Sequence, residues 1–419
     1  MKNERKKLIR ITTADISLDS LLKGQLRFLN QYFDVVGVAK DTGVLQKVGE
    51  REGIRVIDAP LERPITPVKD IKALWFLFRL FRQEKPWCVH ANTPKGSLLA
   101  MIAAWMARVP HRIYLVTGLR YQGTTGVFRF ILKTMERMTC LFASKVIPEG
   151  NGVLCSLQSD HITSKPLEVI HYGNINGKDT SFLSRENTIE TSSFVVDNGQ
   201  IRLQGKSVED AREFVREKLG CTAEDFLFIS IGRITNDKGM GELADAMKRL
   251  EATKQNVKLL LIGELEGEDD LVDTDKLEYF RQSKAVIYVG VQLDIRPFLL
   301  ASDVLVFPSY REGFPNVPLE AGAMNLPCIV TNISGSNEII KDGLNGKIIQ
   351  APLDDKGKRK HDITDALYNT MLWFVCHRAE AKRMGENARP MICERYEQKD
   401  VWLSLLNMYN ALDSQNKNV

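Results

Sequence analysis

The chain has 419 residues, which is more than a single hydrophobic core usually supports, so we expect two domains. Its composition, 44% hydrophobic and 26% charged, is ordinary for a globular protein. The net charge of +4 conceals an asymmetry: residues 1–180 carry 27 Lys and Arg against 16 Asp and Glu, whereas residues 181–419 carry 30 against 37. We therefore expect the basic half to meet an anionic surface, lipid or diphosphate. No nucleic-acid-binding motif accompanies its charge, so nucleic acid is not an expected partner.

Cysteine usage and hydropathy give further expectations. The seven cysteines have no C-x-x-C spacing, which indicates buried, reduced thiols and not disulfides or a zinc site. The start MKNERKKLIRITT is basic but leads into a short strand, so we expect no signal peptide. The most apolar run, 98–109, is interrupted by Arg108 and is too short to cross a bilayer. We expect a cytoplasmic protein that is not integral to a membrane.

In residues 1–180, short apolar segments rich in β-branched residues alternate with helical patterns. A loop over Thr13–Gly24 is expected to precede a helix that begins near Gln25. We predict strands at Leu8–Thr12, Val35–Ala39, Arg55–Ile57, Cys88–Ala91 and Arg112–Val116, and helices at Pro67–Glu84 and Ser97–Ala107. This alternation predicts a parallel sheet with helices on both faces.

The second half repeats the scheme. We predict strands at Phe226–Ile231, Lys258–Ile262, Ala285–Val289, Val304–Phe307 and Pro327–Thr331, and helices at Gly239–Ala252 and Ile295–Ala301. The fold class is therefore α/β, with two doubly wound domains facing a cleft where ligands meet the carboxyl ends of the strands. We assign residues 1–180 to the first domain and 208–389 to the second. Residues 181–207 are interpreted as an interdomain segment with a small hairpin at Asn198-Gly199, and the tail from about Pro390 to Leu412 has a helical pattern.

The most informative segment, residues 307–340, reads FPSYREGFPNVPLEAGAMNLPCIVTNISGSNEII. Its spacing places Glu312 in a loop and Glu320 in the first turns of the following helix. The loop N–H groups and the helix N-terminus face the same space and form an anion site. A carboxylate beside a phosphate suits recognition of sugar or ribose hydroxyls. The alternative is a loop carboxylate and an exposed helical residue without function.

A second pattern, G-R-x4-K-G, joins a strand to the next helix. Arg233 can bind a phosphate through two parallel hydrogen bonds, and Lys238 adds a point charge, so both would neutralise a departing diphosphate. An isolated Arg and Lys at a strand end would more often be solvated charges. Their occurrence with the glutamate pair favours the phosphate interpretation.

Together these motifs resemble the Glu-x7-Glu signature of retaining glycosyltransferase family four, which has the two-domain GT-B fold. The stretch PSYREGFPNVPLEA looks like the enzymes that extend polyprenyl-diphosphate-linked sugars in bacterial glycan assembly. The resemblance extends from near residue 24 to the end of the C-terminal half, and it implies a C-terminal helix, 390–415, that crosses back onto the first domain. It implies Glu312, Arg233 and Lys238 as the catalytic set, with Glu312 at the sugar hydroxyls and Glu320 at the ribose. The other predicted donor-binding residues are Gly232, Val291, Gly313, Phe314, Pro315, Asn316 and Val317, with the nucleobase near Val289–Leu293.

Three segments of the first half are expected at the cleft, one around Gly24 and two that follow strands, at 90–96 and 116–120. The predicted acceptor or cleft residues are Gly24, Gln25, Asn92, Thr93, Thr117, Gly118 and Arg120. Many family members carry His where Thr117 stands, so no His-mediated sugar contact is assigned, and His90 and His111 are interpreted as structural. The run Asn174–Asp179 resembles the family's N-G-x-D turn, and 334–338 resembles its small-residue loop, with no role assigned to Glu338.

A basic, aromatic helix could place the protein on a membrane. Within Pro67–Trp87 aromatic and basic residues interleave, a composition typical of helices that lie on anionic bilayers. The aromatic residues are Trp75, Phe76, Phe78 and Phe81, and the basic residues are Lys69, Lys72, Arg79, Arg82 and Lys85. The alternative is an ordinary helix packed on the sheet. Phe128–Arg137 is a second candidate.

These features predict a retaining, metal-independent transfer of a sugar to a hydroxyl acceptor by front-face attack, in which the departing phosphate accepts the proton and domain closure excludes water. No cofactor or metal is expected, since Asp269-Asp270 and Asp354-Asp355 lie in polar loops. By resemblance the donor is UDP-hexose or UDP-N-acetylhexosamine, and the acceptor is a polyprenyl-diphosphate-linked saccharide at the inner face of the cell membrane. Two alternatives stay open: an epimerase or hydrolase of sugar nucleotides on the same fold, or a non-catalytic scaffold of a glycan-assembly complex.

Overall fold

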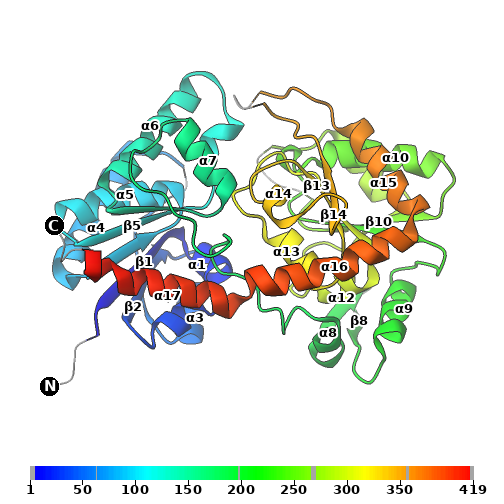
Figure 1. Ribbon diagram of the computed structural model, residues 1–419, viewed down its shortest axis with the longest axis horizontal. Helices are drawn as coiled ribbons and strands as arrows, with labels where there is room; N and C mark the ends of the chain where they lie inside the picture. Colours follow the sequence, from blue (N-terminus) through cyan, green and yellow to red (C-terminus); the bar gives the residue numbers. More distant parts are fainter. Residues whose placement is uncertain (1–4, 63, 197–198, 266–269, 355–357, 416–419) are drawn as a thin grey trace. The chain divides into compact units, whose positions relative to one another are not determined.

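The computed structural model describes residues 5–62, 64–196, 199–265, 270–354 and 358–415. It divides the chain into two compact units (Figure 1). Unit 1 comprises Met1–Gly177 together with Gln398–Val419, and unit 2 comprises Lys178–Glu397. Each unit has its own sheet, its own hydrophobic core and its own set of helices.

Unit 1 is built on a parallel six-stranded sheet in the order β3-β2-β1-β4-β5-β6. Its strands are β1 (Lys7–Ala14), β2 (Asp34–Lys40), β3 (Arg55–Asp58), β4 (Cys88–Ala91), β5 (His111–Val116) and β6 (Lys145–Pro148). Side chains alternate between the faces, and both faces are buried, as expected of a parallel sheet in an α/β protein. In β1, for example, Ile9 and Ile11 belong to one core and Leu8 to the other.

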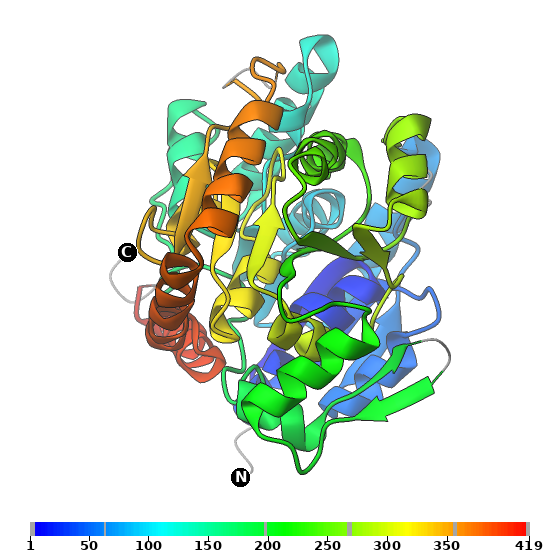
Figure 2. The same cartoon turned by 90° about the vertical axis from the view of Figure 1, so that its right-hand side faces the viewer.

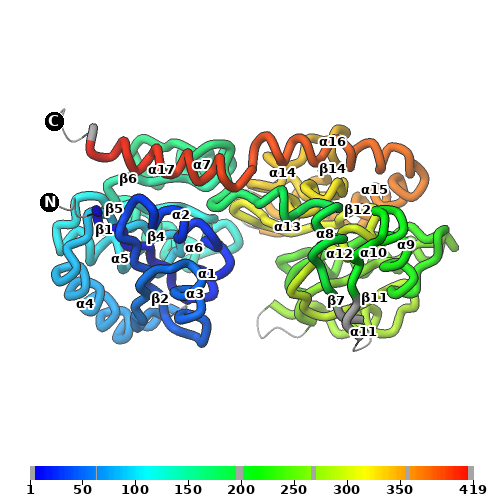
Figure 3. The backbone as a smooth tube through the Cα atoms, turned by 90° about the horizontal axis from the view of Figure 1, so that it is seen from below, coloured from blue at the N-terminus to red at the C-terminus, as the bar shows by residue number. Residues whose placement is uncertain are grey.

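Helices cover both faces of this sheet (Figure 1). The face that carries Ile9 packs against α4 (Pro67–Glu84), α5 (Pro94–Met106), α6 (Gly126–Phe142) and α7 (Asn151–Ser159). The opposite face packs against α1 (Asp15–Leu21), α2 (Gln25–Leu29), α3 (Leu45–Glu52) and α17 (Gln398–Gln415). A short 3-10 turn, η1 (Arg120–Gly123), follows β5. In Figure 3, α17 is the red helix, and it contacts α2.

Unit 2 has a parallel six-stranded sheet in the order β11-β10-β9-β12-β13-β14. Its strands are β9 (Phe226–Ile231), β10 (Val257–Ile262), β11 (Val286–Tyr288), β12 (Val304–Phe307), β13 (Cys328–Thr331) and β14 (Gly346–Ile349). One face packs against α10 (Met240–Ala252), α11 (Thr274–Gln282), α15 (Thr364–Cys376) and the start of α16 (Arg378–Tyr396). Figure 2 shows the orange helix α15 beside the yellow and orange strands, and α15 contacts β13 and β14.

The other face of the unit 2 sheet carries the remaining helices and the end of α16. They are α8 (Arg185–Thr191), α9 (Val208–Lys218), α12 (Arg296–Ala301), α13 (Asn316–Ala323) and α14 (Ser336–Ile339). The predicted doubly wound α/β architecture is therefore confirmed in both units. Cys88–Ala91, Phe226–Ile231, Val304–Phe307 and Pro67–Glu84 are found with the predicted bounds.

The segment interpreted as interdomain, residues 181–207, is part of unit 2. It forms α8 and an antiparallel pair, β7 (Ser193–Val196) with β8 (Gly199–Arg202). Ile189, Phe194 and Leu203 are buried in the same core as α9 and α12. The predicted hairpin is present, although its turn residue Asn198 lies outside the described residues, as do Asp269 and Asp355.

Most of the other predicted elements differ from the structure by one to three residues at their bounds, and two differ in kind. The loop expected over Thr13–Gly24 contains helix α1, because the Asp15 carboxylate accepts hydrogen bonds from the backbone of Ile16, Thr42 and Val44, which fixes the start of the helix. The C-terminal helix 390–415 is in fact parts of α16 and α17. The chain leaves the helical conformation at Glu397 (φ −58°, ψ 128°), whose carboxylate accepts a hydrogen bond from the backbone N–H of Thr180.

All seven cysteines are free, but Cys155 and Cys376 are exposed and Cys393 is half-buried, so the expectation of buried thiols holds for the other four. Burial raises the pKa of the Cys88, Cys140, Cys221 and Cys328 thiols. Within the described part of the chain, no helix combines the length and the apolar character that crossing a bilayer requires.

Candidate functional site

The predicted donor residues gather at one edge of the unit 2 sheet. Strands β9 and β12 are neighbours in the parallel sheet, so the loops that follow them leave from the same edge. The first loop carries Gly232, Arg233 and Lys238, and the second carries Glu312. Gly263, after β10, comes so close to this edge that a Cβ atom on it would lie 1.8 Å from the carbonyl oxygen of Gly232. The sheet therefore brings together motifs that are far apart in the sequence.

Lys238 and Glu312 form an ion pair between the two loops. The Ser309 hydroxyl donates a second hydrogen bond, of 2.8 Å, to the same carboxylate oxygen of Glu312. Both charged side chains are 18% exposed, so they can meet a ligand while they hold each other in place. The lysine of G-R-x4-K-G and the first glutamate of Glu-x7-Glu, which were predicted to act together, are thus in direct contact.

Glycine at position 239 makes this contact possible. Gly239 has a left-handed φ of 70°, and a Cβ atom there would lie 2.2 Å from the carbonyl oxygen of Pro308. The backbone N–H of Tyr310 donates a 2.8 Å hydrogen bond to the carbonyl oxygen of Asp237 nearby. The two loops are therefore packed backbone against backbone, which fixes the position of Lys238.

Arg233 is placed differently from Lys238. Its guanidinium is 56% exposed and lies 3.4 Å from the Asp237 carboxylate. Arg311 approaches the same carboxylate at 3.8 Å. Asp237 thus stands between two exposed guanidinium groups, each able to turn toward a phosphate.

Glu320 also has a lysine partner, which the sequence analysis did not assign. The Nζ atom of Lys178 lies 2.6 Å from a carboxylate oxygen of Glu320, and the two side chains are 13% and 21% exposed. The Lys178 backbone N–H donates to the carbonyl oxygen of Tyr396 at 2.7 Å, which anchors this part of the chain. Lys178 occupies the variable position of the N-G-x-D turn, so the motif could not predict its ion pair with Glu320.

The loop 313–317 is shaped by packing as well as by hydrogen bonds. Phe314 is buried, with its ring centroid 5.5 Å from that of Tyr396, so its side chain packs in the core. Its contribution to the pocket, which was predicted mainly through the backbone N–H group, stays a prediction. Pro315 precedes α13, which begins at Asn316. Gly335 is packed so closely that a Cβ atom would lie 2.7 Å from the Gly313 carbonyl oxygen.

The remaining donor-side residues are half-buried or exposed. Gly313, Asn316 and Val317 are half-buried, and Val317 packs against the core of unit 2. Val291 is 70% exposed in the loop after β11, as expected if it meets a nucleobase. The Glu338 carboxylate accepts a hydrogen bond from the Gly335 backbone N–H at 3.3 Å, which gives this residue a helix-capping contact in α14.

In unit 1, two of the predicted acceptor residues pack against distant parts of the same unit. A Cβ atom on Gly24 would lie 2.8 Å from the Trp402 ring, so the space beside this glycine holds a side chain of α17 and not a ligand. Gln25 is fully buried, accepts a hydrogen bond from Arg10 at 2.9 Å and donates to the Ile175 carbonyl oxygen at 2.8 Å. The prediction that Gln25 meets the acceptor is therefore wrong, whereas the predicted approach of a ligand to the half-buried backbone of Gly24 stays a prediction.

The other acceptor residues follow β4 and β5 at one edge of the unit 1 sheet. The Thr117 hydroxyl donates to the Asn92 carbonyl oxygen at 2.8 Å, and Thr93 accepts from the Thr13 backbone N–H at 2.8 Å. The buried Asn92 amide has no hydrogen-bond partner within the described residues, which is what a group that serves a ligand or water requires. Gly118 is half-buried, and Arg120 is exposed.

Both histidines have the structural role that was predicted. His90 is buried beside Arg10, and burial lowers the pKa of its imidazole well below the usual value. Its Nδ1 atom lies 2.5 Å from the Tyr409 hydroxyl, and His111 Nε2 lies 3.2 Å from Asp413. Each ring thereby ties the sheet of unit 1 to α17. The turn at 174–179 is also confirmed, since the Asn174 side chain accepts from the backbone N–H groups of Asn176 and Gly177.

Over the residues that the structure covers, no cluster of three or more His, Cys, Asp or Glu is arranged to hold a metal ion. Metal independence stays a prediction, as do the individual roles of the residues described above.

Comparisons with known proteins identify the family. Residues 211–391 match the family model for glycosyl transferases group 1, and residues 30–173 match a glycosyl transferase 4-like domain. The capsular polysaccharide biosynthesis glycosyltransferase CapM of Staphylococcus aureus is 31% identical over 412 residues, with 98% of each chain covered. UDP-Gal:alpha-D-GlcNAc-diphosphoundecaprenol alpha-1,3-galactosyltransferase of Escherichia coli is 27% identical over 354 residues, covering 81% of this chain and 84% of its own.

Among solved structures, HepE of Anabaena in complex with UDP-glucose superposes with a TM-score of 0.73 at 17% identity, covering 97% of this chain and 99% of its own. At this identity the likeness concerns the fold, and it supports the assignment of the GT-B architecture. Two matching family models in chain order and a full-length relative above 30% identity establish the relationship. The chain belongs to the group 1 glycosyl transferases of family four and is a glycosyltransferase with the GT-B fold.

Proposed function

We propose that this glycosyltransferase moves a sugar from a UDP-linked donor to a polyprenyl-diphosphate-linked saccharide, as a step in the assembly of a capsule or another lipid-linked polysaccharide. The observation that carries the proposal is the edge of the unit 2 sheet, which carries both the Lys238–Glu312 ion pair and the exposed Arg233. Cations beside a carboxylate suit a diphosphate joined to a hydroxyl-rich sugar. The names of the Staphylococcus and Escherichia relatives and the UDP-glucose bound to HepE support the choice of donor and acceptor.

Our proposed chemistry retains the anomeric configuration. The bond between the anomeric carbon and the β-phosphate oxygen breaks, and the acceptor hydroxyl oxygen bonds to that carbon on the same face. The hydroxyl proton passes to the departing phosphate oxygen. Arg233 and Lys238 would stabilise the negative charge that develops on the diphosphate, without a metal. Glu312 would orient the sugar, and Glu320, held by Lys178, would accept hydrogen bonds from the ribose hydroxyls.

The test is an assay of purified protein with UDP-glucose, UDP-galactose and the two UDP-N-acetylhexosamines, with and without an undecaprenyl-diphosphate-linked N-acetylhexosamine. We expect UDP release that depends on the acceptor, continues in EDTA and yields an α-linked product by proton NMR. Turnover of the donor without acceptor would instead favour the epimerase or hydrolase alternative. Binding of the donor without any turnover would favour the scaffold. An inverted product would overturn the retaining mechanism.

We further propose that unit 1 rests on an anionic membrane through α6. The α4 region, the first candidate, exposes Val68, Ile71 and Trp75, but Phe81 is buried and Phe76 and Phe78 pack on the core, so Trp75 is the exposed aromatic residue of the four. Helix α6, the second candidate, begins with an exposed apolar group interspersed with Arg129 and Lys133. The group consists of Val127, Phe128, Phe130 and Ile131, which are 77%, 43%, 66% and 43% exposed.

Sedimentation with phosphatidylglycerol vesicles tests this surface. We expect a Phe130→Ser/Ile131→Ser variant to remain in the supernatant while the wild type sediments, because the variant loses the apolar area that would enter the bilayer. Leu403→Ser is the matched control, since Leu403 is 47% exposed on α17. Equal sedimentation of all three proteins would show that α6 does not dock on the membrane.

A further inference from the structure

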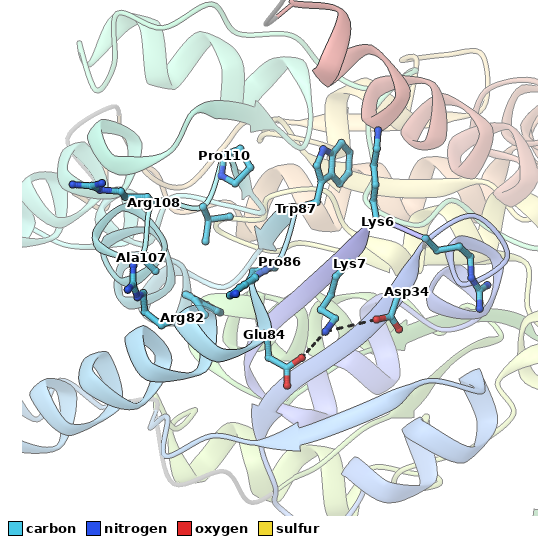
Figure 4. Close-up of a pocket in the computed structure, with 14 residues that line it drawn as sticks. Lys6, Lys7, Asp34, Arg82, Glu84, Pro86, Trp87, Ala107, Arg108 and Pro110 are labelled. Atoms are coloured by element: carbon cyan, nitrogen blue, oxygen red, sulfur yellow. Dashed lines mark hydrogen bonds and ion pairs between the residues drawn. The ribbon is translucent and has the colours of Figure 1, made fainter. Parts of the chain in front are cut away.

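A large open cavity lies in unit 1 at the edge of the sheet opposite the predicted acceptor residues (Figure 4). Its volume is about 920 Å³. It is bordered by Lys7 at the start of β1, by Trp87 just before β4 and by Pro110 just before β5, so it lies at the amino ends of these strands. Asn92 and Thr117 follow the carboxyl ends of β4 and β5. The cavity is therefore separate from the residues discussed for glycosyl transfer.

The lining of this cavity is strongly basic. Asp34 and Glu84 are its two acidic residues, and its cations are Arg5, Lys6, Lys7, Arg82, Lys85 and Arg108. The acidic residues are already neutralised within the protein. Glu84 accepts hydrogen bonds from Arg55 and from Lys7, the latter at 2.8 Å, and Lys7 also lies 3.9 Å from Asp34. The hydrogen bonds from Arg55 are the largest cause that holds the pKa of Glu84 at about 2.

Three of the cations have no such partner. Over the described residues, the side chains of Arg82, Lys85 and Arg108 form no ion pair and no hydrogen bond. Arg82 and Lys85 lie at the end of α4, and Arg108 lies just after α5. Figure 4 shows Arg82 and Arg108 on the same side of the cavity, with Lys6 and Lys7 on the other. The unpaired guanidinium groups of Arg82 and Arg108 thus lie on one side of the cavity.

The backbone at two of these cations is in a costly conformation. Lys85 has φ 47° and Arg108 has φ 59°, in the left-handed region where a helix normally ends with glycine. Long basic side chains therefore stand at two neighbouring helix ends where glycine would be less strained. A cation near a helix C-terminus also interacts favourably with the helix dipole, which is the purely structural explanation.

We infer that this cavity binds a phosphate-bearing ligand. The guanidinium groups of Arg82 and Arg108 on one side, with the ammonium group of Lys85 in the same lining, provide bidentate and point-charge donors for phosphate oxygens. Trp87, Pro86 and Pro110 give the cavity an apolar wall that suits the carbon part of such a ligand. Both an anionic lipid headgroup and a soluble phosphorylated molecule have this chemistry. The inference does not rest on the proposed transferase reaction.

The left-handed residues allow a sharp test, because glycine at these positions removes the charge and relieves the strain. The parent protein is the full chain with Lys238→Ala, which silences the predicted diphosphate site of unit 2. Lys85→Gly/Arg108→Gly is introduced into this parent. The matched control is Lys254→Gly, because Lys254 also has a left-handed φ, of 58°, just after helix α10 in unit 2.

Binding is measured by calorimetry with pyrophosphate and by sedimentation with vesicles of phosphatidylglycerol or phosphatidylcholine. We expect the double variant to bind at least one anionic probe tenfold more weakly than the parent, with an equal or higher melting temperature, while Lys254→Gly binds like the parent. Loss confined to phosphatidylglycerol vesicles identifies a lipid headgroup, and loss confined to pyrophosphate identifies a soluble ligand. Arg82→Gln, a change on the exposed side of α4, should weaken binding of the same probe.

Two outcomes would overturn the inference. One is equal binding of both anionic probes by the parent, the double variant and the control, which would leave the cations with their structural role at the helix ends. The other is a parent protein that binds neither probe.

Discussion

Two lysines hold the two glutamates of the Glu-x7-Glu motif in unit 2. Lys238 was expected near the donor phosphates, and the structure pairs it with Glu312. Lys178, which pairs with Glu320, was not expected, because it is 142 positions away and occupies the variable place in a turn motif. Local patterns can identify the residue types that a site needs. They cannot identify a partner that only the folded chain brings into contact.

Replacement of Lys238 should have a large effect on activity. Lys238→Ala removes a cation from the predicted diphosphate site and leaves the Glu312 carboxylate without its ion-pair partner. We expect kcat/KM to fall by about 100- to 1000-fold, the usual effect of losing one group that stabilises charge in the transition state. Steady-state kinetics with the UDP-sugar donor measure this. Lys248→Ala, which removes a lysine from the exposed side of α10, should retain wild-type activity. A fully active Lys238→Ala would remove this residue from the catalytic set.

Replacement of Lys178 should affect mainly the donor affinity. In Lys178→Met the ion pair with Glu320 is lost, so the carboxylate proposed to bind the ribose is no longer oriented. A charged hydrogen bond of this kind contributes about 1.5 to 3 kcal/mol, so we expect the donor KM to rise about tenfold or more with a smaller change in kcat. Lys178→Arg should restore part of the affinity. If kcat fell and KM did not change, Lys178 would act on the reaction step and not on donor binding.

Glu136 makes the stability of unit 1 depend on pH. This residue of α6 is buried and accepts a 2.6 Å hydrogen bond from the Tyr114 hydroxyl, and burial raises the pKa of its carboxyl to about 7. Between pH 4.5 and 7 the folded protein therefore binds more protons at this site than the unfolded chain, so stability falls as the pH rises.

In Glu136→Gln the fall in stability with rising pH that Glu136 causes should disappear. At pH 8 we expect the variant to be more stable than the wild type by up to about 3 kcal/mol, because each unit of pKa shift corresponds to about 1.4 kcal/mol. At pH 4 the two proteins should be nearly equal. Urea denaturation at both pH values measures the difference. A pH-independent difference would mean that Glu136 titrates normally in the fold.

Among the elements, the turn at Gly239 allows the loop after β9 to pack against the loop after β12. Gly239→Ala would need a left-handed alanine and would push its Cβ atom into the carbonyl oxygen of Pro308. We expect a loss of at least about 2 kcal/mol of stability, together with lower activity, because overpacking adds to the conformational cost. Gly343→Ala is the matched control, since Gly343 has a φ of 75° but open space around it, and it should lose about 1 kcal/mol. Similar losses for both variants would show that the loops can separate without penalty.

At this scale the sequence predicts the regular elements better than it predicts which distant segments contact them. The strands Cys88–Ala91 and Phe226–Ile231 are found as predicted because short, mostly apolar segments are characteristic of strands buried on both faces. Helix α1 was missed because the groups that fix its first turn, at Thr42 and Val44, come from a later loop. The packing beside Gly24 was not foreseen because the ring that lies next to it belongs to Trp402, far along the chain.

For the molecule as a whole, the separate cores of the two units predict that UDP stabilises unit 2 more than unit 1. The predicted donor residues lie in unit 2, whose cores share no residues with those of unit 1. UDP at about 100 times its dissociation constant should stabilise the state that binds it by about 2.7 kcal/mol. Hydrogen exchange should therefore slow in β9, β12 and α13, with a smaller effect in β4 and β5. Lys238→Ala should weaken the response, and equal slowing in both units would contradict a donor site confined to unit 2.

The discontinuous composition of unit 1 has a consequence for biosynthesis. Unit 2 is one uninterrupted segment, whereas unit 1 needs α17, whose Leu405, Leu406, Tyr409 and Leu412 fill one of its two cores. During translation the N-terminal part of unit 1 leaves the ribosome first but must wait, with one face of its sheet incompletely covered, until residues beyond 398 emerge. Unit 2 can complete its fold within that interval. The first part of the chain to be synthesised is thus the last to be finished, and until then it is the part most exposed to chaperones.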